Sequence, residues 1–183
     1  MIEKIIKRVS HKNLEKPIPS ESQMEKVYNA ALRAPDHASL KPTKFIEVTG
    51  RGLEKLSKIF ENYVLESGTE IEKSKIDKYM NAPYRAPMII ILITEKKFHP
   101  KVPEVEQMLS TGAAAQNILL ALDSLGYGAI WRTGIFALND KLNKYFNLKS
   151  NQKILGYIYV GTIKGDKKEK PSVNIGEFVS RWT

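Results

Sequence analysis

Cysteine is absent from the 183 residues, and this absence excludes several kinds of chemistry. Without thiols the chain has no disulfide, no thiolate nucleophile and no cysteine-ligated zinc site. A cysteine-free composition fits a reducing compartment, and no apolar stretch with a cleavage site follows Met1, so we expect a cytoplasmic protein without a secretory signal. The longest uninterrupted apolar run, Met88 to Ile93, is too short to span a bilayer.

Arginine is scarce, although the chain is basic. The formal net charge is +9, but only six of the 29 basic residues are arginine, and the lysines are spread along the whole sequence. Nucleic-acid-binding modules cluster their arginines and lysines among aromatics, so this distribution argues against nucleic acid or an anionic membrane as partner. A phosphorylated small molecule remains compatible with the charge. The densest basic run, residues 164–170, is interrupted by acids and glycine and is typical of a solvated loop.

Residue sets that perform chemistry unaided are also missing. His11, His37 and His99 have no partners at metal-ligand spacing, so we expect no metal site. There is no nucleophile elbow, and residues 36–39 place three triad residue types too close together for triad geometry. The glycines at 126–128 lack the third glycine of a dinucleotide-binding fingerprint. An enzyme built from this chain therefore needs a cofactor.

The hydrophobic patterning predicts a single α+β domain over residues 1–183, with a central sheet, a buried helix and outer helices. The predicted strands lie at residues 45–49, 88–94, 127–131 and 154–161. Helices are predicted at residues 2–8, 53–65, 71–80, 106–125 and 140–146, and another begins at the capping box of Ser20 and Gln23 and ends at Pro35.

Two of these segments carry further expectations. The helix at 106–125 is apolar around nearly its whole circumference, which indicates a place inside the core, with Gly126 as its C-terminal cap. Its Gly112 and Ala113 to Ala115 allow another backbone or a flat ligand to approach closely. The final residues, 173–183, include Phe178, Val179 and Trp182, and this apolar content predicts that they pack against a second subunit.

Three groups of cations and hydroxyls are candidates for a binding site. Arg8 and Ser10 follow the first helix, and a guanidinium beside a hydroxyl and free N–H groups suits a phosphate monoester. Arg33 and His37 follow a helix end, and residues 131–133 bring an aromatic, a cation and a hydroxyl together. Each group also has a structural explanation: a solvated arginine, a cation at a helix C-terminus, and a core tryptophan with an arginine at its rim.

Taken together, four motifs resemble the nitroreductase family, in its short, YdjA-like bacterial branch. They lie at residues 33–37 (Arg-Ala-Pro-Asp-His), at 81–87 (Asn-Ala-Pro-Tyr-Arg-Ala-Pro), at 101–112 (Lys-Val-Pro, Glu-Gln and Ser-x-Gly) and at 126–134 (Gly-Tyr-Gly-Ala-Ile-Trp-Arg-Thr-Gly). The resemblance runs from about residue 4 to Gly161. It implies the nitroreductase-like, FMN-dependent fold with a mostly antiparallel sheet, in a homodimer with two active sites at the subunit interface.

The resemblance also implies an activity and its residues. The activity is that of an oxidoreductase that passes hydride from NADH or NADPH through flavin N5 to nitroaromatics, quinones or similar small acceptors in a ping-pong mechanism. No dedicated catalytic base is implied, and His37 is a candidate proton donor. Matching positions imply FMN contacts at Arg8, Val9, Ser10, Arg33, His37, Trp131, Arg132 and Thr133, and nicotinamide contacts at Ala121, Leu122, Asp123, Ser124, Leu125 and Gly126. The alternative is a flavin- or ligand-binding carrier or sensor without turnover.

The chain departs from the family pattern at three positions. Val9 and Asn13 stand where arginines are usual, and Thr43 stands where an aromatic residue commonly follows the loop proline. Fewer cations in the opening segment are therefore left to meet the FMN phosphate, and Arg8 becomes the main candidate for that contact.

Overall fold

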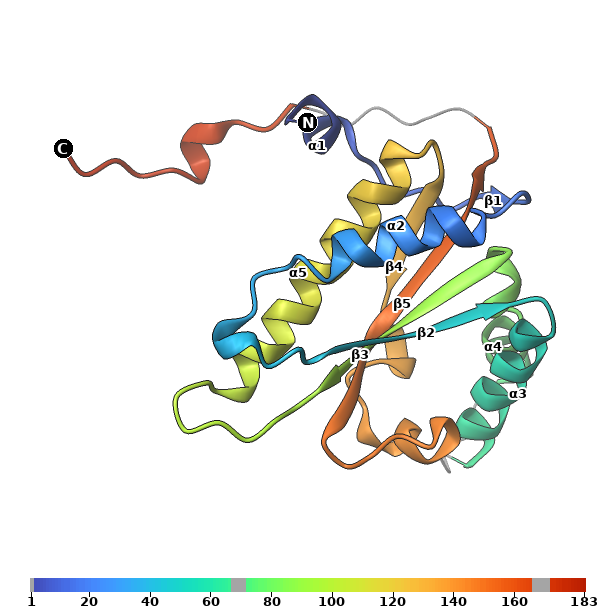
Figure 1. Ribbon diagram of the computed structural model, residues 1–183. Helices are drawn as coiled ribbons and strands as arrows, with labels where there is room; N and C mark the ends of the chain where they lie inside the picture. Colours follow the sequence, from blue (N-terminus) through green and yellow to red (C-terminus); the bar gives the residue numbers. More distant parts are fainter. Residues whose placement is uncertain (1, 67–71, 166–171) are drawn as a thin grey trace.

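The computed structural model describes residues 2–66, 72–165 and 172–183, and its centre is a five-stranded sheet (Figure 1). The long strand β5 (Gln152–Ile163) pairs with β3 (Met88–Glu95) and with β4 (Gly128–Arg132). Strand β2 (Thr43–Thr49) pairs with β3, and the two-residue β1 (Leu14–Glu15) pairs with the end of β5. Every pairing is antiparallel, so the expected α+β class with an antiparallel sheet is confirmed.

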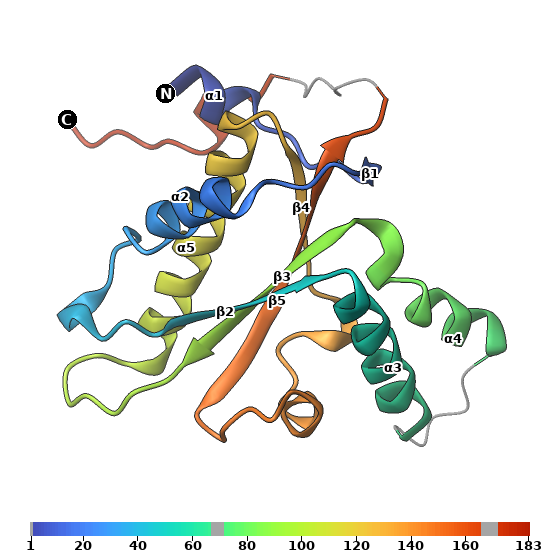
Figure 2. The same cartoon turned by 45° about the vertical axis from the view of Figure 1, so that its right-hand side comes forward.

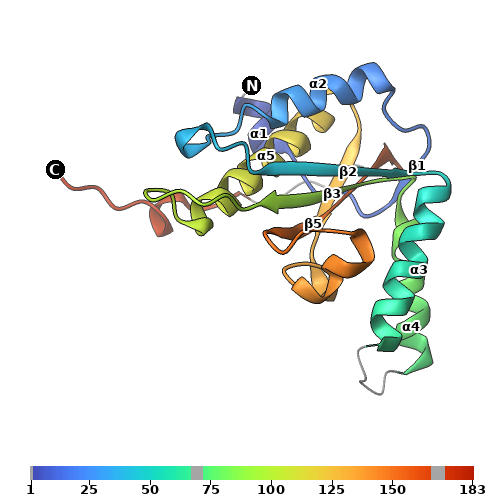
Figure 3. The same ribbon diagram turned by 60° about the horizontal axis from the view of Figure 1, so that its bottom comes forward.

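Helices cover both faces of the sheet (Figure 3). One face carries α2 (Glu21–Ala31) and α5 (Glu104–Ser124), and the other carries α3 (Arg51–Glu66) and α4 (Lys73–Met80). The short α1 (Ile2–Lys7) lies near the C-terminal end of α5 (Figures 1 and 2). Short 3-10 helices complete the chain at η1 (His37–Ser39), η2 (Pro83–Arg85), η3 (Gly134–Phe136), η4 (Asp140–Phe146) and η5 (Ile175–Glu177).

Strand β3 shows why its apolar run has no alternation. The even-numbered residues from 88 to 92 pack against α2 and α5, whereas the odd-numbered residues from 89 to 93 pack against α3. Successive side chains of a strand point to opposite faces, so a strand covered on both faces needs apolar residues at every position. The predicted burial of this strand is therefore confirmed.

A bulge interrupts the regular alternation of β5. Leu92 of β3 pairs with Gly156, but its neighbour Ile93 pairs with Ile154, so Leu155 is the extra residue. As a consequence Ile154 and Tyr157, three residues apart, both pack into the core on the α3 side. A bulge of this kind bends the strand and redirects its side chains.

The helix α2 begins as predicted. Ser20 is its N-cap, and the reciprocal bonds with Gln23 form a capping box. Helix α4 begins at Lys73, whereas the predicted start at Ile71 lies outside the described residues, as do residues 166–170 of the basic run. The segment at 140–146 is a 3-10 helix.

Helix α5 is less enclosed than its composition predicts. Its buried side includes Ile118 and Leu122, but Val105 is exposed and Leu109 is 66% exposed. The sheet and α2 together cover only part of the helix, so an apolar strip on α5 faces outward in a single chain. The C-cap is as expected, because Gly126 adopts a left-handed φ of +86° immediately after the last turn.

The C-terminal segment, residues 172–183, passes near α1, and its end extends away from the sheet and the larger helices (Figures 1 and 2). Its larger apolar side chains are exposed: Val173, Ile175, Phe178, Val179 and Trp182. None of the helices in the described ranges has the length and apolar character needed to cross a membrane.

Candidate functional site

Trp131, in β4, stands between glycines of two neighbouring elements. A Cβ at Gly156 of β5 would lie 2.1 Å from the indole Nε1, and a Cβ at Gly112 of α5 would lie 4.0 Å from Cη2. The first distance is a clash and the second is ordinary van der Waals contact. Glycine at the β5 bulge therefore allows the strand backbone to approach the indole and holds the ring at the junction of β4, β5 and α5.

Arg132, the next residue of β4, lies against an aromatic ring. Its guanidinium carbon is 5.5 Å from the centroid of the Tyr159 ring, a cation–π distance. Burial raises the pKa of the Tyr159 hydroxyl, and the charges of Arg85 and Arg132 oppose this rise. Two guanidinium groups thus act on one buried tyrosine.

The segment that follows α1 runs beside β4. The backbone N–H of His11 donates to the carbonyl of Ala129 at 3.1 Å, which brings residues 8–10 to the strand that carries Trp131. Val9 is buried, Arg8 is half-buried and Ser10 is exposed. The structure therefore brings two groups of predicted flavin residues, 8–10 and 131–133, onto adjacent segments.

Three buried nitrogen atoms of these residues lack a partner. They are Arg8 Nη1, Trp131 Nε1 and Arg132 Nε, and none of them forms a hydrogen bond within the described part of the chain. Buried donors are almost always hydrogen-bonded in folded proteins, because an unpaired one costs about 1–3 kcal/mol. All three atoms are donors and two belong to cations, a chemistry that fits an anionic ligand rich in acceptors such as FMN. Trp131 and Arg132 are consecutive in β4, however, and their side chains pack on opposite faces of the sheet.

Arg33 and His37 lie in the other part of the predicted site. Arg33 is exposed just after α2, and the loop beyond it has left-handed φ angles at Ala38 (+59°), Ser39 (+52°) and Lys41 (+50°). The Asp36 carboxylate supports this loop by accepting from the backbone N–H of Leu40 at 3.2 Å and of Lys41 at 2.7 Å. Strained backbone of this kind often occurs at functional sites.

The loop docks on α5 through His37. Its Nδ1 lies 2.7 Å from Oε2 of Glu106, so the carboxylate selects the tautomer with hydrogen on Nδ1 and orients the ring. Near the other end of α5, the amine of Lys4 donates to Ser124 Oγ at 3.4 Å. Glu106 and Ser124 are about 27 Å apart along the helix at about 1.5 Å per residue. Arg8 and His37 therefore lie towards opposite ends of α5 in one chain.

The comparison with known families identifies this arrangement. The model of the nitroreductase family matches residues 5–162. The chain belongs to the nitroreductase family. This confirms the expected family and, at the level of the family, the expected class of oxidoreductase.

Relatives and solved structures agree with this assignment. The chain is 34% identical over 174 residues to "Putative NAD(P)H nitroreductase YdjA" of Escherichia coli K12, covering 95% of this chain and 93% of the relative. It is 32% identical over 177 residues to a Haemophilus influenzae protein named "Putative NAD(P)H nitroreductase", covering 94% of each. Among solved structures, a nitroreductase-like protein from Bacillus cereus has a TM-score of 0.85 at 23% identity, covering 100% of this chain and 96% of the other. An FMN-dependent nitroreductase from Clostridium difficile has a TM-score of 0.75 at 21% identity, with both chains fully covered.

The segment predicted to contact nicotinamide is the C-terminal end of α5. In this nitroreductase Leu122 is fully buried in the core, and the residues at 121, 123 and 125 are partly buried. Only Ser124 and Gly126 are exposed, and Ser124 already accepts from Lys4. Contact with the nicotinamide in this segment stays a prediction, and the side chain of Leu122 is not available for it.

The departures from the family pattern have visible consequences. The hydroxyl of Thr43 lies 3.2 Å from that of Thr111, which in turn accepts from the buried Thr94 at 2.9 Å. A polar chain between β2, β3 and α5 thus occupies the region where an aromatic residue is usual. Asn13 is exposed, and its carbonyl accepts from the backbone of Lys164 at 3.1 Å.

Two residues of the candidate site, Gly156 and Glu106, are not among the binding residues that the resemblance implied. Gly156 interrupts an apolar strand, and an isolated glycine in a strand indicates a bulge or a close backbone approach. Glu106 forms part of a family motif, but only the fold reveals that it binds His37 across 69 positions of sequence. The role of Gly156 could have been found from the local sequence, whereas no local pattern indicates the contact between Glu106 and His37.

Proposed function

We propose that this nitroreductase family member is an FMN-dependent oxidoreductase that uses NAD(P)H to reduce small, flat, electron-poor acceptors such as nitroaromatics and quinones. The observation that carries the proposal is the buried guanidinium nitrogen of Arg8, unpaired within the described residues, on the segment that runs beside the strand carrying Trp131. NAD(P)H is in the names of the two curated relatives, and FMN dependence is in the name of the Clostridium difficile structure.

When bound, FMN supplies the hydride chemistry, accepting from the nicotinamide and then donating to the second substrate in turn. The residues of the chain bind and orient. Arg8 and Ser10 would hold the phosphate, and Trp131 to Thr133 would hold the ring. Arginine stays protonated throughout, so Arg132 provides constant positive charge beside a cofactor that becomes more negative on reduction.

His37 is the candidate for handling a proton. Its Nδ1 hydrogen is committed to Glu106, so Nε2 is the atom available to a substrate. The side chain of His37 is more than half exposed, which leaves water as an alternative donor. Each substrate in turn must be oriented against the flavin, and this orientation contributes more to such a reaction than a dedicated base does.

The active unit in this proposal is a homodimer. Arg33 and His37 lie towards the opposite end of α5 from Arg8, a separation longer than a mononucleotide, so a second copy would supply them to the same flavin. The outward strip of α5 around Leu109 and the exposed tail residues Phe178 and Trp182 offer apolar surface for that contact. A cytoplasmic location also remains a prediction.

Absorption spectroscopy tests the proposal. We expect the purified protein to be yellow, to bleach with NADPH or NADH without oxygen, and to recover its colour with a quinone or nitroaromatic compound. Flavin that stays oxidised with both nucleotides would instead favour a carrier or sensor. A colourless protein that does not take up added FMN would contradict both.

A further inference from the structure

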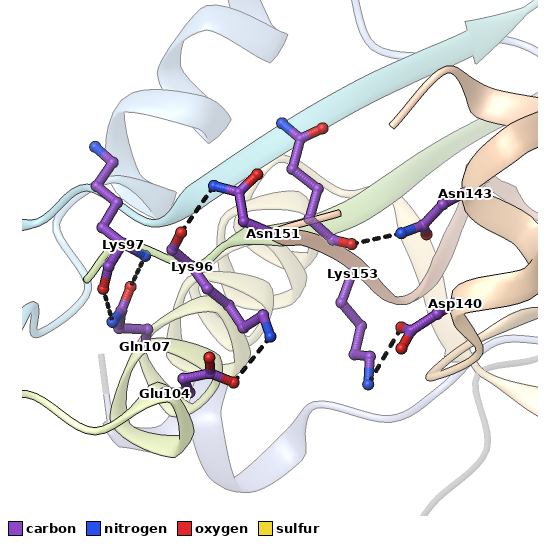
Figure 4. A network of polar contacts seen from close by, with 9 residues as sticks. Lys96, Lys97, Glu104, Gln107, Asp140, Asn143, Asn151 and Lys153 are labelled. Carbon is purple, nitrogen blue, oxygen red and sulfur yellow. Dashed lines mark hydrogen bonds and ion pairs between the residues drawn. The ribbon is translucent and has the colours of Figure 1, made fainter. Parts of the chain in front are cut away.

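The loop between β3 and α5, residues 96–103, presents an aromatic ring to solvent on a well-supported backbone. Phe98 is 97% exposed. The residues just before it are held at both peptide groups. Lys96 N–H donates to the carbonyl of Asn151 at 2.7 Å, and the Asn151 amide donates back to the carbonyl of Lys96 at 2.8 Å (Figure 4). Because the backbone of the loop is already ordered, little conformational entropy is lost when the ring binds a ligand.

Helix α5 supports the same loop. The amide of Gln107, which is 2% exposed, accepts from Lys97 N–H and donates to the carbonyl of Lys97, each at 2.9 Å. The residue before it, Glu106, holds His37. Consecutive residues of one helix turn therefore fix both the exposed loop and the flavin loop of the proposed function.

Two lysines of this loop have no ion-pair partner among the described residues. Lys96 is paired with Glu104 at 2.9 Å, but Lys97 and Lys101 are exposed and form no ion pair in the described parts of the chain. Figure 4 shows the Lys97 side chain pointing away from the network. His99 accepts from Lys101 N–H through Nδ1 at 3.2 Å, so its Nε2 carries the hydrogen and is a donor.

The nearby acids have other partners. Glu95 accepts from the amide of Gln152 at 2.7 Å, and Asp140 is paired with Lys153 at 3.3 Å. Glu95 keeps its negative charge, because the amide that it accepts from is neutral, and Glu104 lines the same region, but neither carboxylate is paired with Lys97 or Lys101.

A cavity of about 480 Å³ lies between this loop and the turn before β5, where Ser150 and Asn151 line it. Its volume is typical of small-molecule sites. An aromatic face suits a nucleobase, and cations with a neutral imidazole donor suit phosphate. We infer that residues 96–103 bind the phosphorylated adenosine end of the pyridine nucleotide and give a preference for NADPH over NADH.

This inference rests on the proposed function, because the nucleotide must reach the flavin with its other end. The shared support of the two loops on Glu106 and Gln107 places the nucleotide loop beside His37. The 2′-phosphate of NADPH would meet both Lys97 and Lys101, and the adenine would stack on Phe98. The discriminating charge is thus supplied by residues outside the flavin-binding set.

Calorimetric titration of the oxidised, FMN-loaded protein tests the site without turnover. The probes are adenosine 2′,5′-bisphosphate and adenosine 5′-monophosphate. We expect the bisphosphate to bind about tenfold more tightly, since one charged contact of moderate strength corresponds to about that factor. K97A and K101A should each reduce the preference, whereas K97R should retain most of it.

Phe98 has its own signature. F98A should weaken both probes by about tenfold, because base stacking does not depend on the 2′-phosphate. F98W should restore binding of both. K78A, an exposed lysine on α4 without an ion pair in the described residues, is the matched control and should change nothing.

The outcomes separate this inference from the proposed function. If NADPH and NADH reduce the flavin equally well in wild type and in every loop variant, the nucleotide loop is wrong while the oxidoreductase stands. If neither nucleotide reduces the flavin but bisphosphate binding depends on Lys97 and Phe98, the nucleotide loop stands and the proposed oxidoreductase is wrong. Unchanged titrations in all loop variants, or a change of mass in F98A by light scattering, would overturn the inference and, in the second case, show a subunit contact.

Discussion

Trp131 occupies the space that a side chain at position 156 would need, because a Cβ on Gly156 would lie 2.1 Å from the indole Nε1. The two residues belong to paired strands, and Gly156 lies next to the bulge at Leu155. The position of the Trp131 ring at the candidate flavin site thus depends on the glycine at position 156.

The first prediction concerns the packing of the Trp131 indole against position 156. Gly156→Ala should displace the indole and reduce FMN occupancy. It should lower the free energy of unfolding by about 1–3 kcal/mol or more, because the Cβ also meets the Arg132 carbonyl oxygen at 2.8 Å and the φ of +151° disfavours an L side chain. Gly112→Ala is the matched control, since its Cβ meets the same ring at 4.0 Å and alanine favours a helix. Urea unfolding and the flavin spectrum measure both effects. Equal behaviour of the two variants would show that the indole is not held by position 156.

Arg8 is the second subject. Arg8→Ala should release FMN during purification, because a charge-assisted contact to phosphate contributes about 1.5–3 kcal/mol. The apoprotein should stay folded with an unchanged or slightly raised Tm, since Nη1 is buried without a partner in the described residues.

Two further variants control for charge and geometry. Arg8→Lys should recover only part of the affinity, because an ammonium group replaces a planar fork. Lys12→Ala removes an exposed charge from the same segment and should have no effect on occupancy. Full occupancy and an unchanged dissociation constant in Arg8→Ala would place the phosphate site elsewhere, with Arg33 and Arg132 as the next candidates.

The dimer can be tested on α5. Leu109→Asp puts a charge on the outward apolar strip and should shift the mass measured by light scattering towards the monomer, with loss of FMN at the same time. Leu65→Asp on α3 is the control, because Leu65 is 59% exposed and Leu109 is 66% exposed, yet only Leu109 adjoins the proposed site. A wild-type protein that is monomeric with FMN bound would contradict the homodimer.

Alkaline stability is the fourth subject. Burial, and to a lesser extent Tyr159, raises the pKa of the Tyr157 hydroxyl well above its usual value near 10, and this hydroxyl donates to the carbonyl of Phe136 at 2.7 Å. Below about pH 10, the usual pKa of tyrosine, Tyr157 is protonated in both the folded and the unfolded state. As the pH rises further, the unfolded chain loses this proton while the folded chain keeps it, so the free energy of unfolding falls.

Tyr157→Phe separates the two contributions of the hydroxyl. At pH 8 the variant should lose about 1 kcal/mol with the hydrogen bond. Above pH 10 its stability should fall less steeply than that of the wild type, because one raised tyrosine has been removed. Tyr28 keeps part of the dependence, since burial and Glu47 raise the pKa of that hydroxyl too. Parallel stability curves for the two proteins, measured by urea unfolding, would refute this account.

Local features of the sequence determined much of the fold. The capping box at Ser20, the unbroken apolar run at 88–93 and the glycine at 126 each act through neighbouring residues, so they predict a helix start, a doubly buried strand and a helix end without knowledge of the rest. The family motifs at 33–37 and 126–134 predicted the candidate site through the resemblance to nitroreductases.

Only the tertiary structure decided how these pieces meet. The two-residue β1 has too few residues for a periodic pattern and exists because β5 pairs with it. The outward face of α5 follows from what α2 and the sheet leave uncovered. The pairing of His37 with Glu106 and of Trp131 with Gly156 depends on strand register and helix docking, which are set by contacts between residues far apart in the chain.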